Sequence, residues 1–241
     1  MRTPISLTYD DVLLVPQYSD IKSRSEIEVG VAIGGRYSRP IHFKLPIISS
    51  PMDTVTGAAM ANVMNKSGGL GIIHRYCTVD EQAKMVRRIK AGMKAAAIGV
   101  TGDYMERAQE LVNNDCKILC IDVAHGHHIS VKKAIKALKK KFDDRAIIIA
   151  GNVATADGYC DLSDWGADAV RVGIGGGSIC STRIQTGHGV PTLQSIMDCV
   201  NSYGDAYIIA DGGIRFSGDI AKINSPPLGG PPSLLSFSAV S

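Results

Sequence analysis

The chain of 241 residues carries 26 Lys and Arg against 23 Asp and Glu, so its formal net charge is only +3. This balance excludes the broad basic surface that binding to nucleic acid or to an acidic membrane needs, and 45% apolar with 20% charged residues excludes wholesale disorder. No apolar run is long enough to span a membrane and no secretory signal opens the sequence, so we expect a cytoplasmic protein.

Short apolar runs, each closed by small or polar residues, recur along the chain and predict buried strands. We expect seven, within residues 45–50, 69–74, 95–101, 117–122, 146–152, 169–175 and 207–212. Stretches with helical spacing lie between most of these runs, at 79–91, 103–113, 130–141, 155–165 and 192–202. Because buried strands that alternate with helices form parallel sheets, the pattern predicts an α/β fold, either a TIM barrel or a doubly wound sheet.

The strand ends distinguish these two folds. Six of the seven runs end in a polar or glycine-rich signature. In a barrel all such ends converge on one face, whereas a doubly wound sheet gathers them at one switch point. We therefore predict a TIM (β/α)8 barrel over residues 1–222, with 1–45 as a pre-barrel segment. The Pro-, Gly- and Ser-rich tail at 223–241 cannot continue a helix, so the barrel is predicted to be truncated after its seventh strand.

The segment after the sixth run, residues 173–183, is the strongest candidate for chemistry. Its closely spaced glycines let backbone amides turn toward an anion, and Ser178 adds a hydroxyl donor. Cys180 lies three residues before Arg183, whose charge favours the nucleophilic thiolate. The alternative is a flexible loop with a buried cysteine. Most of the other cysteines are expected to be small core residues.

Aspartates end two of the predicted strands. Asp211 precedes Gly212 and Gly213, and a carboxylate at the rim of a barrel is well placed to accept hydrogen bonds from ribose hydroxyls. Asp122 is placed to do the same for a second nucleotide. For either aspartate alone, a helix cap or a turn is the alternative.

Together these motifs resemble one family, that of IMP dehydrogenase and GMP reductase, which act at carbon 2 of a purine nucleotide. The resemblance runs from about residue 5 to Lys222 and rests on ordered segments at 7–16, 49–56, 151–155, 173–183 and 210–219. It implies the TIM barrel already predicted. It also implies a covalent mechanism, in which a cysteine thiolate adds to the base and hydride departs to a nicotinamide cofactor.

The resemblance further implies the roles of individual residues. Cys180 is the expected nucleophile, and Thr182 matches the family's catalytic threonine. The residues expected to bind the nucleotide's base, phosphate and ribose are Ser50, Met52, Gly177, Ser178, Asp211 and Gly213. Asp122 and Asn152 are expected on the side of the cofactor, NAD or NADP.

The family resemblance also implies a metal site and an assembly. The carbonyl oxygens of Gly175, Gly177 and Cys180 correspond to a monovalent-cation site, normally potassium. Family members are tetramers, so a homo-oligomer is expected here.

Two branches of the family remain open. Segments 183–191 and 213–219 look more like the dehydrogenase, which converts IMP to XMP in guanine nucleotide biosynthesis. Segment 21–26 is similar to GMP reductases, which convert GMP to IMP with NADPH. The chain also lacks the pair of CBS modules that most dehydrogenases insert between the second and third strands.

Past Lys222 the sequence departs from the family. Neither the eighth strand nor the flap whose Arg-Tyr pair activates water is recognisable there. Our hypothesis is that the chain is truncated or frameshifted and impaired in turnover. The third possibility is therefore a catalytically impaired nucleotide-binding or subunit-interaction remnant.

Overall fold

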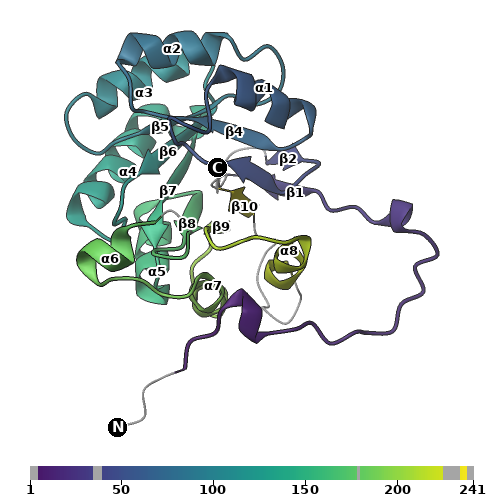
Figure 1. The fold of residues 1–241 in the computed structure, drawn as a ribbon. Coiled ribbons are helices and arrows are strands. Elements are labelled where there is room, and N and C mark those ends of the chain that lie inside the picture. The colour runs from purple at the N-terminus through teal and green to yellow at the C-terminus, as the bar shows by residue number, and fades with distance from the viewer. Residues whose placement is uncertain (1–4, 35–39, 178–179, 225–233, 238–241) are drawn as a thin grey trace.

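The computed structural model describes residues 5–34, 40–177, 180–224 and 234–237. Its centre is a closed barrel of eight parallel strands, surrounded by helices (Figure 1). In barrel order from β3 the strands are β3 (Ile47–Ser49), β4 (Leu70–Ile73), β5 (Ala95–Ile98), β6 (Ile118–Asp122), β7 (Ile147–Val153), β8 (Ala169–Val172), β9 (Tyr207–Asp211) and β10 (Leu234–Phe237). The predicted barrel class is confirmed, and each predicted run coincides with one of β3 to β9.

The eighth position in the barrel is held by β10, which comes from the atypical tail. Leu235 pairs with Ile47 of β3 on one side and with Ala210 of β9 on the other. The edges of β3 and β9 are therefore both paired. The sequence had instead predicted a barrel that is truncated after its seventh strand. The prediction rested on the prolines at 226–232, which cannot continue a helix, but the short apolar run after them suffices for a strand of four residues.

Helices connect the strands and cover the outside of the barrel. They are α1 (Ala58–Lys66), α2 (Val79–Arg87), α3 (Tyr104–Asn113), α4 (Ile129–Phe142), α5 (Ala156–Trp165), α6 (Thr182–Thr186), α7 (Thr192–Val200) and α8 (Ser217–Ile223), with a 3₁₀ turn η3 (Asp143–Arg145) after α4. The five predicted helices correspond to α2, α3, α4, α5 and α7. Within the described residues, no helix has the length and apolar character that crossing a membrane requires.

Apolar residues that alternate along each strand build two cores. In β6, Ile118 and Cys120 belong to the core inside the barrel, whereas Leu119 and Ile121 belong to the core beneath the helices. Strands that are covered on both faces need apolar residues at every position. This is why the sequence shows continuous apolar runs rather than an alternating pattern.

The pre-barrel segment contributes a short antiparallel sheet of β1 (Val31–Ile33) and β2 (Ile41–Phe43). Its buried residues Ile33 and Phe43 share the inner core with Ile48 and Leu70 of the barrel. The sheet therefore covers the end of the barrel at which the strands begin. The opposite end, where the strands finish, stays open for a site.

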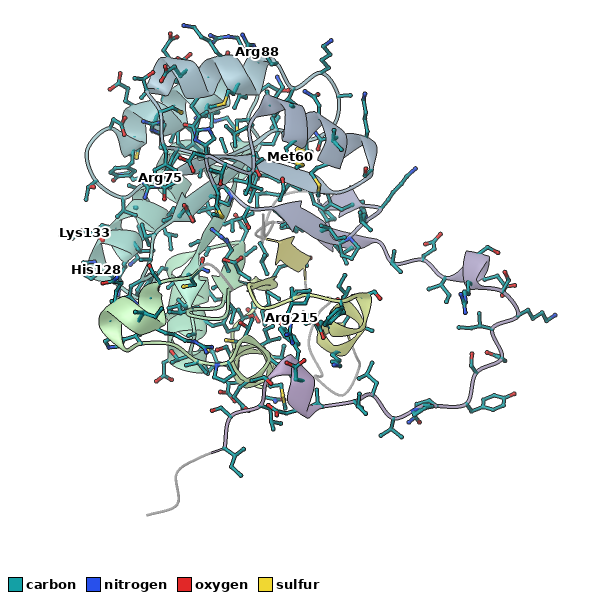
Figure 2. All side chains as sticks on the ribbon, viewed as in Figure 1. Met60, Arg75, Arg88, His128, Lys133 and Arg215 are labelled. Carbon is teal, nitrogen blue, oxygen red and sulfur yellow. The ribbon has the colours of Figure 1, made fainter. Side chains whose placement is uncertain are left out.

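The beginning of the described chain packs beside its last helix. The 3₁₀ helix η1 (Tyr9–Asp11) precedes an exposed segment that includes a second 3₁₀ turn, η2 (Arg24–Glu26). Arg215, labelled in Figure 2, forms an ion pair with Asp10, and Lys222 of α8 donates a hydrogen bond of 2.7 Å to the carbonyl oxygen of Tyr9. These contacts fix the loop between β9 and α8, which borders the open end of the barrel.

Deletion of residues 225–241 should destabilise the barrel, because it removes β10 and leaves β9 and β3 with unpaired edges. We expect the free energy of unfolding to fall by about 2 kcal/mol or more, since each lost backbone hydrogen bond contributes about 1 kcal/mol. The open edges should also promote aggregation. Urea unfolding and size-exclusion chromatography measure the two effects. Deletion of residues 238–241 alone leaves β10 in place and is the matched control; equal stability of both deletion variants would contradict the closure by β10.

Candidate active site

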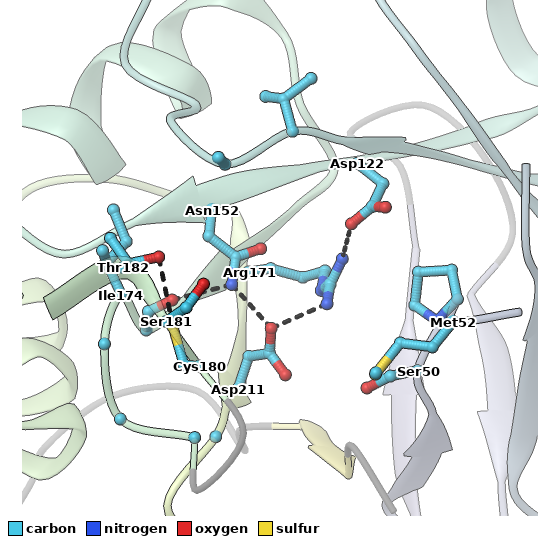
Figure 3. A pocket seen from close by; sticks show the side chains of 18 of the residues that line it. Ser50, Met52, Asp122, Asn152, Arg171, Ile174, Cys180, Ser181, Thr182 and Asp211 are labelled. Atoms are coloured by element: carbon cyan, nitrogen blue, oxygen red, sulfur yellow. Dashed lines mark hydrogen bonds and ion pairs between the residues drawn. The ribbon is translucent and has the colours of Figure 1, made fainter. Parts of the chain in front are cut away.

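A cavity of about 490 Å³ opens at the face of the barrel where the strands end (Figure 3). Barrel enzymes place their active sites at this face. The polar and reactive side chains that line the cavity are Ser50, Arg75, Tyr76, Asp122, Asn152, Arg171, Cys180, Ser181, Thr182 and Asp211.

The cavity brings together most of the residues predicted to form the site. These are Ser50, Met52, Asp122, Asn152, Gly175, Gly177, Cys180, Thr182 and Asp211. Gly213 lines a neighbouring cavity of about 300 Å³ together with Tyr9 and Thr192. Ser178 lies outside the described residues. The structure thus places these predicted residues in one cavity, and the role of each residue stays a prediction.

The Cys180 thiol stands just before α6 and is half-buried in the cavity wall. Its Sγ lies 3.2 Å from Oγ1 of Thr182 (Figure 3). Burial by itself raises the pKa of this thiol, but hydrogen bonds from Thr182 and from the Gly175 backbone, with the charge of Arg183, outweigh burial and lower the pKa of Cys180. A lowered pKa increases the fraction of thiolate, which is the nucleophilic form.

The remaining cysteines differ from Cys180 in their surroundings. Cys116, Cys120, Cys160 and Cys199 are buried in the cores, as predicted for most of them. Burial raises the pKa of Cys116, Cys120 and Cys199 to about 12, so these three thiols stay protonated at neutral pH. Thiolate chemistry is thus concentrated at the cavity.

Close packing explains why the loop before Cys180 is rich in glycine. A Cβ atom at Gly173, whose φ is +147°, would lie 1.9 Å from the carbonyl oxygen of Asp211. A Cβ at Gly176 would lie 2.0 Å from Oγ1 of Thr192. The glycines therefore let the loop lie directly against the end of β9 and the start of α7, which fixes the height of Cys180 above the barrel.

A buried arginine that sequence reasoning did not assign to the site lies beneath the cavity. Arg171 of β8 is 5% exposed and points into the barrel. Its guanidinium donates a hydrogen bond of 2.6 Å to Asp122 at the end of β6 and one of 2.7 Å to Asp211 at the end of β9 (Figure 3). Burial alone would lower the pKa of Arg171, but the negative charges of Asp211 and Asp122 and the hydrogen bond to Asp122 outweigh burial and raise it, so the guanidinium stays charged.

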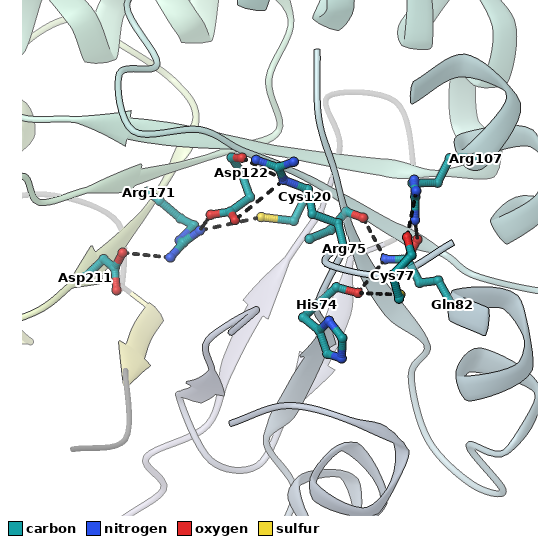
Figure 4. Close-up of polar contacts among 10 residues, drawn as sticks. His74, Arg75, Cys77, Gln82, Arg107, Cys120, Asp122, Arg171 and Asp211 are labelled. Atoms are coloured by element: carbon teal, nitrogen blue, oxygen red, sulfur yellow. Dashed lines mark hydrogen bonds and ion pairs between the residues drawn. The ribbon is translucent and has the colours of Figure 1, made fainter. Parts of the chain in front are cut away.

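Asn152 and Arg75 extend this network on its two sides. Nδ2 of Asn152 donates to Oδ2 of Asp211 at 2.6 Å and to the carbonyl oxygen of Gly173 at 2.8 Å. Nε of Arg75 donates to the backbone oxygen of Asp122 at 3.2 Å (Figure 4). The signal for Arg171 was present in the sequence as a lone charge inside an apolar strand, because such a charge needs buried partners.

Comparison with known proteins gives the family. Residues 6–225 match the model of the IMP dehydrogenase / GMP reductase domain. The chain belongs to the IMP dehydrogenase / GMP reductase family. The crystal structure of inosine 5′-monophosphate dehydrogenase from Legionella pneumophila superposes with a TM-score of 0.85 at 39% sequence identity, covering 97% of this chain and 69% of that one.

Curated relatives carry both family names. Inosine-5′-monophosphate dehydrogenase of Cryptosporidium parvum is 35% identical over 90% of this chain and 64% of its own length. The dehydrogenase of Nitrosopumilus maritimus is 31% identical over 90% of this chain and 71% of its own length. GMP reductase of Leishmania major is 30% identical over 91% of this chain and 72% of its own length. The chain thus spans about two thirds of the length of these relatives.

Substitution of Thr182 should make Cys180 less reactive near neutral pH. In Thr182→Val the hydroxyl that stabilises the thiolate is lost, so the pKa of Cys180 rises and the pH midpoint of its alkylation by iodoacetamide moves upward. Mass spectrometry of the Cys180 peptide at a series of pH values gives this midpoint. Thr182→Ser should keep it, and Ser181→Ala is the control for loss of a neighbouring hydroxyl. An unchanged midpoint in Thr182→Val would rule out the hydrogen bond as a cause.

Proposed function

We propose that the chain is a purine nucleotide oxidoreductase that acts on IMP with NAD, in the manner of an IMP dehydrogenase. The observation that carries the proposal is a cysteine of lowered pKa, Cys180, beside Thr182 in the cavity that also holds Asp211 and Asp122. A thiolate supplies the nucleophile, and two carboxylates at separate strand ends suit the ribose groups of two nucleotides. Membership of the family supports redox chemistry on a purine nucleotide.

In the proposed reaction the Cys180 thiolate adds to carbon 2 of the hypoxanthine ring. The new S–C bond forms as the electron pair of the C2–N3 double bond moves to N3. When hydride leaves carbon 2 the pair returns, the double bond is restored, and the nucleotide remains attached to Sγ. Addition of water then releases XMP and the thiol. The nicotinamide cofactor, when bound, supplies the acceptor for the hydride.

The remaining residues bind and orient in this scheme. Asp211 accepts from the ribose of IMP, with Ser50 and Met52 beside the base, while Asp122 and Asn152 hold the cofactor. The hydrogen bonds that Asp211 accepts from Asn152 and Arg171 fix the direction of its carboxylate. Each chain is expected to work within a homo-tetramer, which sedimentation equilibrium can test.

The carbonyl oxygens of Gly175, Gly177 and Cys180 are proposed to hold a potassium ion. Among the described residues no donor bonds to the carbonyls of Gly175 and Cys180, and the carbonyl of Gly177 accepts a single bond, 3.1 Å from the amide of Cys180. Each oxygen therefore keeps a lone pair for a cation, and backbone carbonyls are ligands that suit potassium. A cation there would stabilise the loop that carries Cys180.

GMP reductase activity is the second candidate, supported by the similarity to the Leishmania major enzyme. It uses the same thiolate and carbon 2 but consumes NADPH and releases ammonia from GMP. Parallel assays with IMP plus NAD and with GMP plus NADPH separate the two candidates.

Mixing the purified chain with IMP, NAD and potassium should yield a covalent adduct. Intact-protein mass spectrometry should show the mass of one purine nucleotide on the chain, together with a burst of reduced cofactor that does not exceed one equivalent. The burst is expected because the Arg-Tyr pair that activates water in the family is not recognisable in this sequence.

Two variants control this experiment. Cys180→Ala should abolish both the adduct and the burst, while Cys77→Ser, which removes a partly exposed thiol outside the cavity, should keep both. Nucleotide binding without an adduct or burst would favour the remnant hypothesis, and absence of binding would overturn the proposed function.

A further inference from the structure

One buried cation connects the two carboxylates that are assigned to different nucleotides. Asp122 and Asp211 lie on strands β6 and β9, and Arg171 on β8 is bonded to both (Figure 4). The two bonds use different nitrogens of the same guanidinium, Nη1 for Asp122 and Nη2 for Asp211. A shift of either carboxylate therefore strains a group that also holds the other.

Each aspartate gives only one of its oxygens to Arg171. Asp122 uses Oδ1 and Asp211 uses Oδ2. Among the described residues, Oδ1 of Asp211 accepts no hydrogen bond, and the ion-pair partner of Oδ2 of Asp122 is Nε of Arg75, 4.0 Å away. Both carboxylates line the cavity and are 19% and 12% exposed at their side chains. Each therefore keeps an oxygen for the hydroxyl of a ligand.

The Arg171 side chain is only 6% exposed, and it reaches the cavity from the inside of the barrel. The inner core around it is built from apolar residues of the strands, such as Ile149, Ala169 and Ile209. Its Nε atom is buried and has no hydrogen-bond partner among the described residues. Since a buried charge without its partners is costly, the position of the guanidinium is determined by the two aspartates. The guanidinium in turn helps to hold both carboxylates, with Asn152 as a second donor to Asp211.

We propose that Arg171 is a positioning residue that couples the nucleotide subsite at Asp211 to the cofactor subsite at Asp122. The inference rests on the proposed function, which assigns one ligand to each aspartate. A ligand that orders one carboxylate also orders Arg171 and hence the second carboxylate, so the second ligand binds to a site that is already arranged. By linkage, each ligand raises the affinity of the other by the same factor.

The coupling is measured by calorimetry in a Cys180→Ala background, which allows both ligands to bind without reacting. IMP is titrated in the absence and in the presence of saturating NAD. We expect NAD to tighten IMP binding by about fivefold or more. In Arg171→Lys this factor should fall toward one, because an ammonium group cannot bond two carboxylates in the fixed fork geometry of a guanidinium.

A second variant tests the connection without altering Arg171. Asp122→Asn lies in the cofactor subsite and is not expected to contact IMP. If Arg171 links the subsites, Asp122→Asn should nonetheless weaken IMP binding about threefold or more with NAD absent, because Arg171 loses its charged partner. Independent subsites predict an unchanged affinity for IMP.

Arg107→Lys is the matched control for loss of a buried guanidinium. Arg107 is 6% exposed and bonds to Asp103 and Gln82 beneath the helices, outside the cavity. Its replacement should lower the thermal stability and leave both affinities and the coupling factor unchanged.

The outcomes separate the inference from the proposed function. Binding of neither IMP nor NAD by the Cys180→Ala chain would overturn both. Binding of both ligands with a coupling factor that survives Arg171→Lys, or with an affinity for IMP that is unchanged in Asp122→Asn, would overturn the coupling role of Arg171 alone.

Discussion

The ion pairs of Arg171 are the constraint around which the open end of the barrel is arranged. A guanidinium inside an apolar core loses its hydration, and the attraction of Asp122 and Asp211 repays that loss only while both bonds stay short. Such a cluster is a poor source of net stability. Its effect is geometric. The two bonds of Arg171 hold the ends of β6, β8 and β9 level with one another, and this arrangement positions the polar atoms that face the cavity.

The loop that carries Cys180 is connected to the hydrogen-bond network of Arg171. Asn152 bonds both Asp211 and the carbonyl oxygen of Gly173, and Gly173 packs directly against the backbone of Asp211. The position of Cys180 is therefore set by contacts at the base of its loop, while Thr182 and Arg183 adjust the charge of its sulfur. Placement and reactivity of the thiol have separate physical causes, so they can be altered by separate substitutions.

The sequence predicted the parts of this molecule that depend on local patterning and on recurrent motifs. The seven continuous apolar runs became β3 to β9, because strands covered on both faces must be apolar throughout. Residues that end these strands, such as Asp122, Asn152 and Asp211, met in one cavity because parallel strands end on one face. Arg171 was missed because its role depends on partners 40 and 49 positions away. The strand β10 was missed because its apolar run is short and follows a proline-rich stretch, and because its pairing depends on the edges of β9 and β3.

Closure by β10 also bears on how the molecule folds. Position 236 pairs with position 48, so the last bond of the ring joins the two ends of the barrel sequence. Contacts of such long range form slowly, because closing the intervening loop costs conformational entropy before the strand–strand hydrogen bonds can form. During synthesis the seven earlier strands can associate while the ring is still open, and β9, which carries Asp211, gains its second neighbour last. The completed pocket is thus a late product of folding, available only after residue 237 has left the ribosome.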